Sequence, residues 1–381
     1  MTSSEERLVV IGAGLVGGSI ALAARAAGVA RITLVEVDEG VAARARELGL
    51  AEEVTGDLDA AVEGASVIIA AVPAGAVEEV LVRAAAAAPA TALLSDAASL
   101  KSASTLNVTS RLRDEGRGPA RFVGGHPMAG SERSGPEAAD AQLFQGASWV
   151  LTPTAATADD TLARLSALVR RFGARVVALP PERHDELVAI VSHLPQVVAS
   201  SLAAVAADAV DSAGDAVLAV AGGGFRDTTR IAASDPGLWV PILRGNRTAV
   251  LDALDAYGDT LARLRGALAG ERWDEVQQLL ARASTARQRL VPKAAPSALA
   301  DVVVPLDDRP GQLATATTAL GAAGINVEDL TMRHAPTGGR GALLVRVGAA
   351  DLEAAVTVLE AAGLGAHVAP DAATEPSEDA P

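Results

Sequence analysis

The sequence predicts an α/β chain that begins with a doubly wound parallel sheet, continues with an all-helical domain and ends with a small α+β domain. Three patterns support this prediction. Short β-branched runs alternate with alanine-rich helical runs up to about residue 180, apolar residues then recur at helical spacing, and a strand–helix–strand–strand–helix order follows near the C-terminus. A chain of 381 residues is long enough for two or three domains.

Residues 1–180 are expected to form the sheet domain. Strand-like runs such as LVVIGAG, RITLVEV and TALLSDA are separated by helical stretches, of which 17–27, 40–48 and 75–87 are the clearest. Strands that alternate with helices imply right-handed crossovers and a parallel sheet. The runs FVGGHP, SWVLTP and ARVVALP are expected to add further strands before residue 180.

Residues 181–291 are expected to form a helical domain, with helices in the run that starts at Pro181, over 238–268 and over 272–290. The long apolar surface of these helices predicts burial against a second copy of the chain, so a homodimer is expected. A linker at 292–299 leads to a small ferredoxin-like domain at 300–370. The acidic tail at 371–381 is expected to be disordered.

Composition excludes several classes of function. The formal net charge of −15 argues against binding to nucleic acid or to an anionic membrane. No run of residues has the composition expected of a membrane-spanning segment. Because the chain has no cysteine, disulfides, thiolate catalysis and cysteine-ligated metals are excluded, and no metal site is expected. The N-terminus does not resemble a signal peptide, so a soluble cytoplasmic protein is predicted.

A glycine-rich turn after the first strand predicts a Rossmann-like dinucleotide site. Gly12 permits the tight turn, Gly14 allows a pyrophosphate to approach the backbone, and Gly17 lets the next helix pack on the strand. Glu36 ends the second strand and is a better candidate than Asp38 to bind a ribose diol, which favours NAD over NADP. The predicted cofactor-binding residues are Gly12, Gly14, Leu15, Val16, Gly17, Glu36, Val72 and Pro73.

Histidine is the residue type expected to accept the hydroxyl proton when an alcohol is oxidised at neutral pH. Of the five histidines, His334 and His367 lie in the small domain, and His184 is expected to be solvated at a charged helix start. His126 follows a strand-like run, where open α/β sheets bind ligands. His193 in an apolar helix is the other candidate, although a hydrogen-bonded core histidine is the commoner arrangement there.

The segment GFRDTTRIAASDPGLW, residues 224–239, gathers two arginines and two aspartates around an apolar stripe. Ion pairs on a helix surface would explain the charges. A bound anion would also explain why an arginine lies among apolar residues. The residues by themselves leave both explanations open.

Four motifs together resemble the prephenate dehydrogenase (TyrA) family: GAGLVGGSIA, GGHPMAGSERSG, SHLP and FRDTTRIAASDPGLW, in this order over residues 7–290. The resemblance implies NAD-dependent oxidation and decarboxylation of prephenate to 4-hydroxyphenylpyruvate. It implies that His126 accepts the hydroxyl proton, that Ser99 holds the hydroxyl or His126, and that Arg230 binds a substrate carboxylate, with Asp227 orienting it or capping the turn. The further substrate-binding residues that it implies are Glu132, Ser192, His193 and Gln196.

Two departures from the family pattern leave the substrate open. Many members have SHLPH, whereas this chain has Gln196 in place of the second histidine, and Ala98 replaces the usual glycine before the loop serine. A neutral amide offers no positive charge to a carboxylate but can hydrogen-bond a keto or an amino group, so arogenate is the alternative substrate.

Two other functions are disfavoured. A β-hydroxyacid dehydrogenase would carry a catalytic lysine in its helical domain, and residues 181–291 contain no lysine. A catalytically silent regulator that binds NAD and an amino acid would not need His126, Ser99 and Arg230 together.

The segment LDDRPGQLATATTALGAAGINVEDL resembles an ACT domain, a regulatory module that commonly binds amino acids. The resemblance implies a regulatory site that includes Gly311, at a helix N-terminus, and Asn326. Tyrosine, the end product of the pathway, is the expected effector and would bind between two such domains. A domain that only assists dimerisation is the alternative.

Overall fold

The computed structural model describes residues 6–130, 133–214, 216–290, 299–307, 312–325, 327–334 and 340–368. It divides into two compact units, residues 1–262 and 263–381, each of which is described by itself. The predicted tail and all but the last residue of the predicted linker lie outside the described residues, as do Glu132, Gly311 and Asn326.

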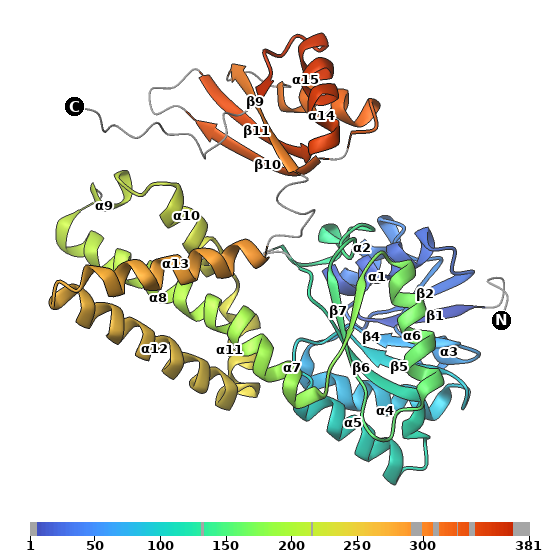
Figure 1. The fold of residues 1–381 in the computed structure, drawn as a ribbon. Helices are drawn as coiled ribbons and strands as arrows, with labels where there is room; N and C mark the ends of the chain where they lie inside the picture. Colours follow the sequence, from blue (N-terminus) through green and yellow to red (C-terminus); the bar gives the residue numbers. More distant parts are fainter. Residues whose placement is uncertain are drawn as a thin grey trace, which may run out of the picture. The chain divides into compact units, whose positions relative to one another are not determined.

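An eight-stranded sheet forms the core of the first unit (Figure 1). Its strands lie in the order β3-β2-β1-β4-β5-β6-β7-β8. Their bounds are β1 (Arg7–Ile11), β2 (Arg31–Val35), β3 (Glu53–Thr55), β4 (Val67–Ala70), β5 (Leu93–Asp96), β6 (Phe122–Pro127), β7 (Ser148–Thr152) and β8 (Arg175–Ala178).

The prediction of a parallel sheet is confirmed for β1 to β6 and wrong at the far edge. There β7 runs antiparallel to β6, and β8 runs parallel to β7. The described part of the loop between β6 and β7 contains only the short 3₁₀ turn η4 (Pro136–Ala138) and no crossover helix. A strand that follows such a loop returns in the opposite direction, whereas parallel pairing needs a longer crossover.

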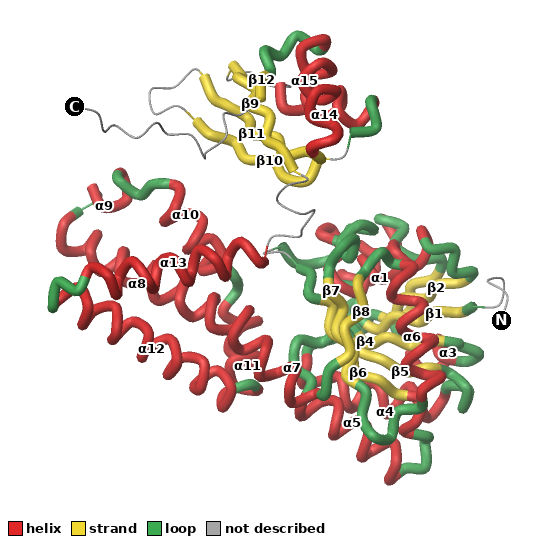
Figure 2. The backbone as a smooth tube through the Cα atoms, viewed as in Figure 1, coloured by secondary structure: helices red, strands yellow, loops and turns green. Residues whose placement is uncertain are grey.

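Helices cover both faces of this sheet, as Figure 2 shows. Alternate residues of β1 point to opposite faces, so Leu8 and Val10 join one buried cluster while Val9 and Ile11 join the other. The first cluster takes residues from α1, α2 and α6, the second from α3, α4 and α5. The helix bounds are α1 (Leu15–Ala26), α2 (Glu39–Glu47), α3 (Leu58–Val62), α4 (Val77–Ala87), α5 (Ser102–Asp114) and α6 (Asp159–Arg171).

A helical segment follows β8, and no described strand interrupts it before residue 291, as predicted. The helix expected over 238–268 is divided at Asn246, which separates α11 from α12. The helices are α7 (Pro181–Val188), η5 (Ala189–His193), α8 (Leu194–Ala213), α9 (Ala216–Ala219), α10 (Gly223–Thr229), η6 (Arg230–Ala233), α11 (Pro236–Gly245), α12 (Arg247–Ala269) and α13 (Trp273–Leu290).

The turn η5 between α7 and α8 is a π-helix. Pro195, which follows it, has no N–H to donate to the carbonyl four residues earlier, and a widened turn accommodates this loss. The continuous helical run Pro181–Asp211 has a mean hydropathy of 1.6 in its most apolar window. By length and composition it could cross a membrane, contrary to the expectation from the sequence, yet it also carries the buried polar residues His184, Asp185 and His193.

The second unit contains a four-stranded antiparallel sheet in the order β10-β11-β9-β12. The predicted order of strands and helices in this small domain is confirmed, including the last strand. Its core contains Val302, Val304 and Val345 from the sheet and Leu320 and Leu359 from the helices. The elements are β9 (Leu299–Asp307), α14 (Gln312–Ala322), β10 (Val327–His334), β11 (Arg340–Gly348), η8 (Ala349–Asp351), α15 (Leu352–Ala361) and β12 (His367–Val368).

Candidate active site

The glycine turn between β1 and α1 has the geometry that a dinucleotide site needs. Gly12 has a φ of +103°, and a Cβ there would lie 2.4 Å from the carbonyl oxygen of Ala71. A Cβ on Gly17 would lie 1.9 Å from the carbonyl oxygen of Gly12. A Cβ on Gly14, by contrast, would meet no described atom within 4 Å. Gly12 and Gly17 are therefore required by the fold, and Gly14 leaves open space.

The open space at Gly14 lies at the N-terminus of α1. Leu15 and Val16 form the first turn of this helix, and no side chain of the described residues caps it. The first N–H groups and the positive end of the helix dipole are thus available to phosphate groups. Val72 lies beside the turn, since its Cγ1 would be 3.3 Å from a Cβ on Gly12, and Pro73 follows it.

Glu36 lies against the same turn. Its Oε2 accepts a hydrogen bond from the backbone N–H of Ala13 at 2.9 Å, and its Oε1 accepts one from the N–H of Asp38 at 3.0 Å. The carboxylate of Asp38 instead accepts from the N–H of Val41 and caps α2. Of the two carboxylates, Glu36 is the one placed next to the phosphate-binding turn. The turn, the open helix end and this carboxylate fit NAD.

A cleft of about 720 Å³ in the first unit joins residues from the sheet to residues from the helical segment. It is lined by six of the predicted catalytic and substrate-binding residues, namely Ser99, His126, Ser192, His193, Gln196 and Arg230. Glu132, the seventh, lies outside the described residues. Arg133, Asp235 and Trp239, which the sequence analysis did not assign to the site, also line the cleft.

A buried ion pair fixes the strand that carries His126. The ammonium of Lys101 pairs with the carboxylate of Asp96 and donates to the carbonyl of Gly125 at 2.8 Å. Asp96 also accepts from the N–H of Gly125 at 3.1 Å. A Cβ on Gly125 would lie 2.5 Å from the carbonyl oxygen of Asp96, so only glycine permits this approach. Both backbone polar groups of Gly125, the residue before His126, are therefore hydrogen-bonded: the N–H to Asp96 and the carbonyl to Lys101.

The prediction that His184 is solvated is wrong, because its side chain is 0% exposed. Its Nε2 lies 2.9 Å from Nδ1 of His126, and its Nδ1 lies 2.7 Å from Oδ1 of Asp185. Asp185 also accepts from the backbone N–H groups of Lys101 and Ser102, at 2.9 and 2.8 Å. A chain of side chains thus runs from His126 in the cleft to a carboxylate at the start of α5.

The charged residues around His184 and Asp185 in PERHDE are typical of a solvent-exposed segment, so the burial of these two residues was not predicted. The buried residues of α7 are Pro181, His184, Asp185 and Val188. Their spacing of i, i+3, i+4 and i+7 defines one face of a helix. This spacing is the signal that could have identified both residues as buried.

Burial and hydrogen bonding set the protonation states in this chain. Burial would raise the pKa of Asp185, but hydrogen bonds from His184, Lys101 and Ser102 outweigh it and leave the pKa below its usual value. For His126, burial lowers the pKa well below 6.5, and a positive charge on a protonated His184 or on Lys101 acts in the same direction. At neutral pH, His126 is therefore a neutral imidazole and Asp185 is a carboxylate.

His193 is buried and lies beside Asn246. The side-chain amide of Asn246 donates to the carbonyl of Asp185 at 2.8 Å and lies 3.2 Å from Nδ1 of His193. Burial lowers the pKa of His193 to about 4. Its ring meets that of Trp239 edge to face, with centroids 6.0 Å apart. The break between α11 and α12 at Asn246 thus supplies a polar residue to the site.

Arg230 begins η6 directly after α10 and is exposed where it lines the cleft. Asp235 caps the N-terminus of α11, because its carboxylate accepts a hydrogen bond from the N–H of Gly237 at 2.8 Å. The segment that gathers charges in the sequence therefore contains a helix cap and an arginine of the cleft. The role expected of Asp227 stays a prediction.

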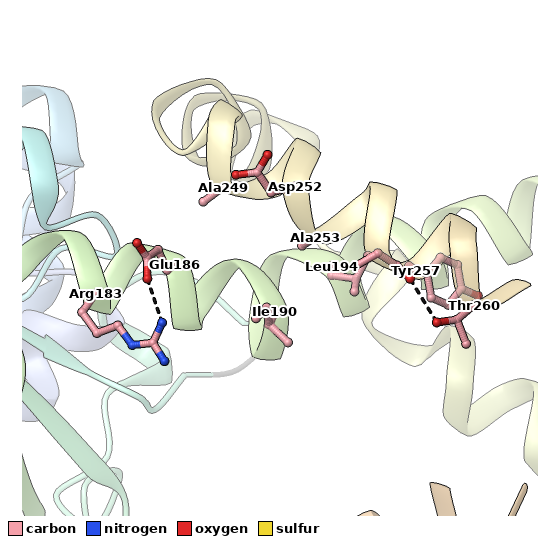
Figure 3. Close-up of a pocket in the computed structure, with 10 residues that line it drawn as sticks. Arg183, Glu186, Ile190, Leu194, Ala249, Asp252, Ala253, Tyr257 and Thr260 are labelled. Carbon is pink, nitrogen blue, oxygen red and sulfur yellow. Dashed lines mark hydrogen bonds and ion pairs between the residues drawn. The ribbon is translucent and has the colours of Figure 1, made fainter. Parts of the chain in front are cut away.

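A second cavity of about 410 Å³ lies between α7, η5 and α12. Figure 3 shows the pair of Arg183 and Glu186 at this cavity, together with Ile190, Leu194 and Tyr257. Neither a histidine nor a residue of the sheet lines it. The cleft around His126 is therefore the candidate active site.

The carboxyl ends of β1 and β6 lie at the same edge of the sheet, since these strands are parallel. This edge thus carries both the dinucleotide turn and the histidine that begins the cleft. A fold and a site of this kind define a nicotinamide-dependent dehydrogenase.

Comparison with known proteins identifies the family. The nucleotide-binding domain of prephenate dehydrogenase matches residues 20–178, and the dimerization domain of prephenate dehydrogenase matches residues 180–282. Prephenate dehydrogenase of Bacillus subtilis is 32% identical over 339 residues, which cover 87% of this chain and 89% of that protein. The chain belongs to the prephenate dehydrogenase family.

Solved structures also resemble the chain, among them the two that follow. Prephenate dehydrogenase from A. aeolicus in complex with hydroxyphenyl propionate and NAD+ is 27% identical, with a TM-score of 0.67 over 75% of this chain and 98% of that one. Arogenate dehydrogenase from Synechocystis is 30% identical, with a TM-score of 0.65 over 75% of this chain and 100% of that one.

Proposed function

We propose that the chain catalyses the NAD-dependent oxidative decarboxylation of prephenate to 4-hydroxyphenylpyruvate. The observation that carries this proposal is the single cleft in which His126, from β6, and Ser99, from the loop after β5, meet Arg230, from the helical segment. A neutral imidazole can take a hydroxyl proton, and a guanidinium can bind a carboxylate through two parallel hydrogen bonds. Prephenate carries both a ring hydroxyl and carboxylates.

The reaction balances with one proton shuttled by His126. His126 accepts the proton of the ring hydroxyl while the C–H bond at the same carbon gives up its electron pair as hydride and a C=O bond forms. NAD, when bound, supplies the acceptor for this hydride. The ring carboxylate then leaves as CO2, its C–C bonding electrons aromatise the ring, and the phenolate oxygen regains the proton from His126.

Other residues of the cleft bind and orient the substrate in this proposal. The hydroxyl of Ser99 holds the ring hydroxyl or His126, and Arg230 anchors a carboxylate. His193 is neutral at pH 7, and because its Nδ1 accepts from Asn246, its Nε2 carries a proton for a substrate oxygen. Ser192 and Gln196 also line the cleft and are proposed to contact the substrate. Glu132 belongs to the proposal on its resemblance alone.

Arogenate is the second candidate substrate, and Gln196 supports it. The amide Oε1 of Gln196 is buried and has no hydrogen-bond partner among the described residues, while Nε2 lies 3.4 Å from Oγ of Ser200. A buried acceptor without a partner is costly, so a ligand that brings an N–H donor would satisfy it. Arogenate brings an ammonium where prephenate has a keto oxygen.

Initial rates of NADH formation with purified protein, prephenate and arogenate supplied separately, each with NAD and NADP, test these proposals. Activity with prephenate and NAD supports the main proposal, and a preference for arogenate supports the alternative. Oxidation of neither substrate would leave a silent NAD-binding regulator. The variant His126→Asn should lose about 10²-fold or more in kcat. An unaltered rate would contradict the role of His126.

The assembly that we propose is a homodimer formed through the helical segment, in a soluble cytoplasmic enzyme. Several large apolar residues of α8, α11 and α12 are exposed, including Val205, Leu238 and Leu251. The match of residues 180–282 to a dimerization domain supports the same assembly. We also propose domain boundaries at residues 180 and 291. The boundary at 180 is supported by the end of β8 at Ala178 and the start of α7 at Pro181.

For the small domain, we propose an ACT-like regulatory module that binds tyrosine. The antiparallel sheet with two helices packed in its core supports this proposal, as does the extent of the match to the Bacillus subtilis relative. Gly311 and Asn326 are the proposed ligand-binding residues. Rates measured with and without saturating tyrosine test the idea, and identical kinetics would leave only a role in dimerisation.

A further inference from the structure

We propose that His184 and Asp185 are positioning residues that hold His126 in the one tautomer able to act as a base. They also stabilise the positive charge that His126 gains when it takes the substrate proton. This inference deepens the proposed dehydrogenase function and rests on it.

Donors and acceptors along the chain of side chains determine the tautomer. Both carboxylate oxygens of Asp185 accept backbone N–H groups, Oδ1 from Lys101 and Oδ2 from Ser102. An ionised carboxylate only accepts, so Nδ1 of His184 must donate to it. In the state that we propose, His184 carries no second proton, so its Nε2 has a lone pair and accepts a hydrogen bond.

The only donor that His126 can offer to this lone pair is an N–H at Nδ1, which lies 2.9 Å away. The Nε2 of His126 is then unprotonated and is the ring atom available to the substrate in the cleft. Without His184, the ring of His126 could hold its proton on Nε2, where it would oppose proton transfer from the substrate. A partner that fixes the tautomer of a catalytic histidine has the same role in Ser-His-Asp triads.

The charges around His126 show why a negatively charged group is needed to stabilise its protonated form. A positive charge on His184, Lys101 or His193 lowers the pKa of His126, and the negative charge of Asp185 raises it. Lys101 is paired with Asp96, so the negative charge of Asp185 is the one left to offset an imidazolium at His126. His184 connects the two through hydrogen bonds and keeps Asp185 out of the cleft.

The far end of the chain is held rigidly. Asp185 is bound by two N–H groups at the start of α5, and its own carbonyl accepts from the side chain of Asn246. The carboxylate of Asp185 and the ring of His184 are buried. A fixed carboxylate can orient two rings in series only if neither of them rotates freely, and this packing provides that condition.

Steady-state kinetics of four variants test the proposal with whichever substrate the wild-type protein oxidises. His184→Leu removes both hydrogen bonds, and kcat should fall about 10- to 100-fold while the KM values for substrate and NAD change by less than about threefold. His184→Gln offers one donor and one acceptor and should recover most of the rate. Arg183→Gln, on the exposed side of the same helix, is the matched control and should match the wild type.

The pH profile of Asp185→Asn separates positioning from a general loss of structure. Asp185 raises the pKa of His126, so the acid limb of kcat/KM should move to lower pH while the plateau falls. Full activity in His184→Leu together with an unmoved limb in Asp185→Asn would overturn the proposal. A lack of activity in the wild type with either substrate would instead refute the proposed function.

A second measurement does not depend on activity. In protein labelled with ¹⁵N-histidine, the ring nitrogens of His126, assigned with His126→Asn, should report a proton on Nδ1 near neutral pH. The opposite tautomer, with the proton on Nε2, would overturn the proposal even if the His184 variants fail to fold. Because the chain has five histidines, the ring signals are few enough to assign.

Discussion

The side-chain amide of Asn246 lies 3.2 Å from Nδ1 of His193, a residue of the active-site cleft, and both residues are buried. Because the amide is a donor, Nδ1 of His193 is an acceptor and the ring is neutral. Protonation of His193 would break this hydrogen bond and place a charge in a buried site. The low pKa of about 4 follows from that burial.

His193 should make the folded protein less stable at mildly acidic pH. Its pKa is near 6.5 in the unfolded chain and about 4 in the folded one, so between these values only the unfolded chain binds the proton. The free energy of unfolding therefore falls as the pH decreases from 6.5 towards 4, by about 2 kcal/mol at pH 5 from this group. Urea unfolding of wild type and His193→Asn at pH 7 and pH 5 measures the difference. Equal pH dependence in both proteins would refute it.

Replacement of Glu36 should weaken the preference for NAD. The carboxylate repels a 2′-phosphate, and Glu36→Gln removes this charge while keeping an acceptor for the N–H of Ala13. We expect the ratio of kcat/KM with NADP to kcat/KM with NAD to rise by about tenfold or more, which corresponds to about 1.4 kcal/mol. Asp38→Asn is the control, since asparagine also caps a helix and the ratio should stay constant.

Loss of Arg230 should chiefly weaken substrate binding. A charge-assisted hydrogen bond contributes about 1.5–3 kcal/mol, so Arg230→Ala should raise the KM for substrate by about 10- to 100-fold. Arg230→Lys should restore only part of this, because an ammonium lacks the planar fork of guanidinium. Arg244→Ala, at an exposed position of α11 that does not line the cleft, should behave as wild type. A wild-type KM in Arg230→Ala would show that the anion binds elsewhere.

Gln196 should control the choice between a keto and an amino side chain. Gln196→His removes the unpaired amide oxygen and introduces a ring that can donate a hydrogen bond. The ratio of kcat/KM for prephenate to kcat/KM for arogenate should rise by about tenfold, since one hydrogen bond to a charged group is exchanged. Competition assays with both substrates measure this ratio directly, and no change would exclude Gln196 as the selecting residue.

Local patterns in the sequence were sufficient to predict most of the fold. Alternation of β-branched and helical runs predicted β1, β2, β4, β5 and β6 but not the three-residue strand β3, and the glycine spacing predicted the turn at Gly12. The direction of β7 could not be predicted, because it depends on a loop whose composition does not distinguish a return from a crossover. Asn246 was missed for a related reason, since one polar residue in an apolar helical pattern is compatible with a continuous helix.

The candidate site was predicted in part. Ser99, His126 and Arg230 are far apart along the chain, and the resemblance to a family assigned them to one cleft before any geometry was available. His184 and Asp185 were not assigned to the site, because the charged neighbours Glu182, Arg183 and Glu186 made an exposed segment the expected structure. Which face of α7 is buried depends on packing against β6 and α5, and this tertiary information is carried only weakly by the spacing of residues.

The hydrogen bond between His126 and His184 makes chemical competence conditional on assembly. The glycine turn and all eight strands of the sheet precede residue 179, whereas the partner of His126 belongs to α7. A chain in which α7 is not docked therefore lacks the residue that, in our proposal, fixes the tautomer of His126. In the arrangement that we propose, the chemical step therefore requires α7 to be docked on the sheet.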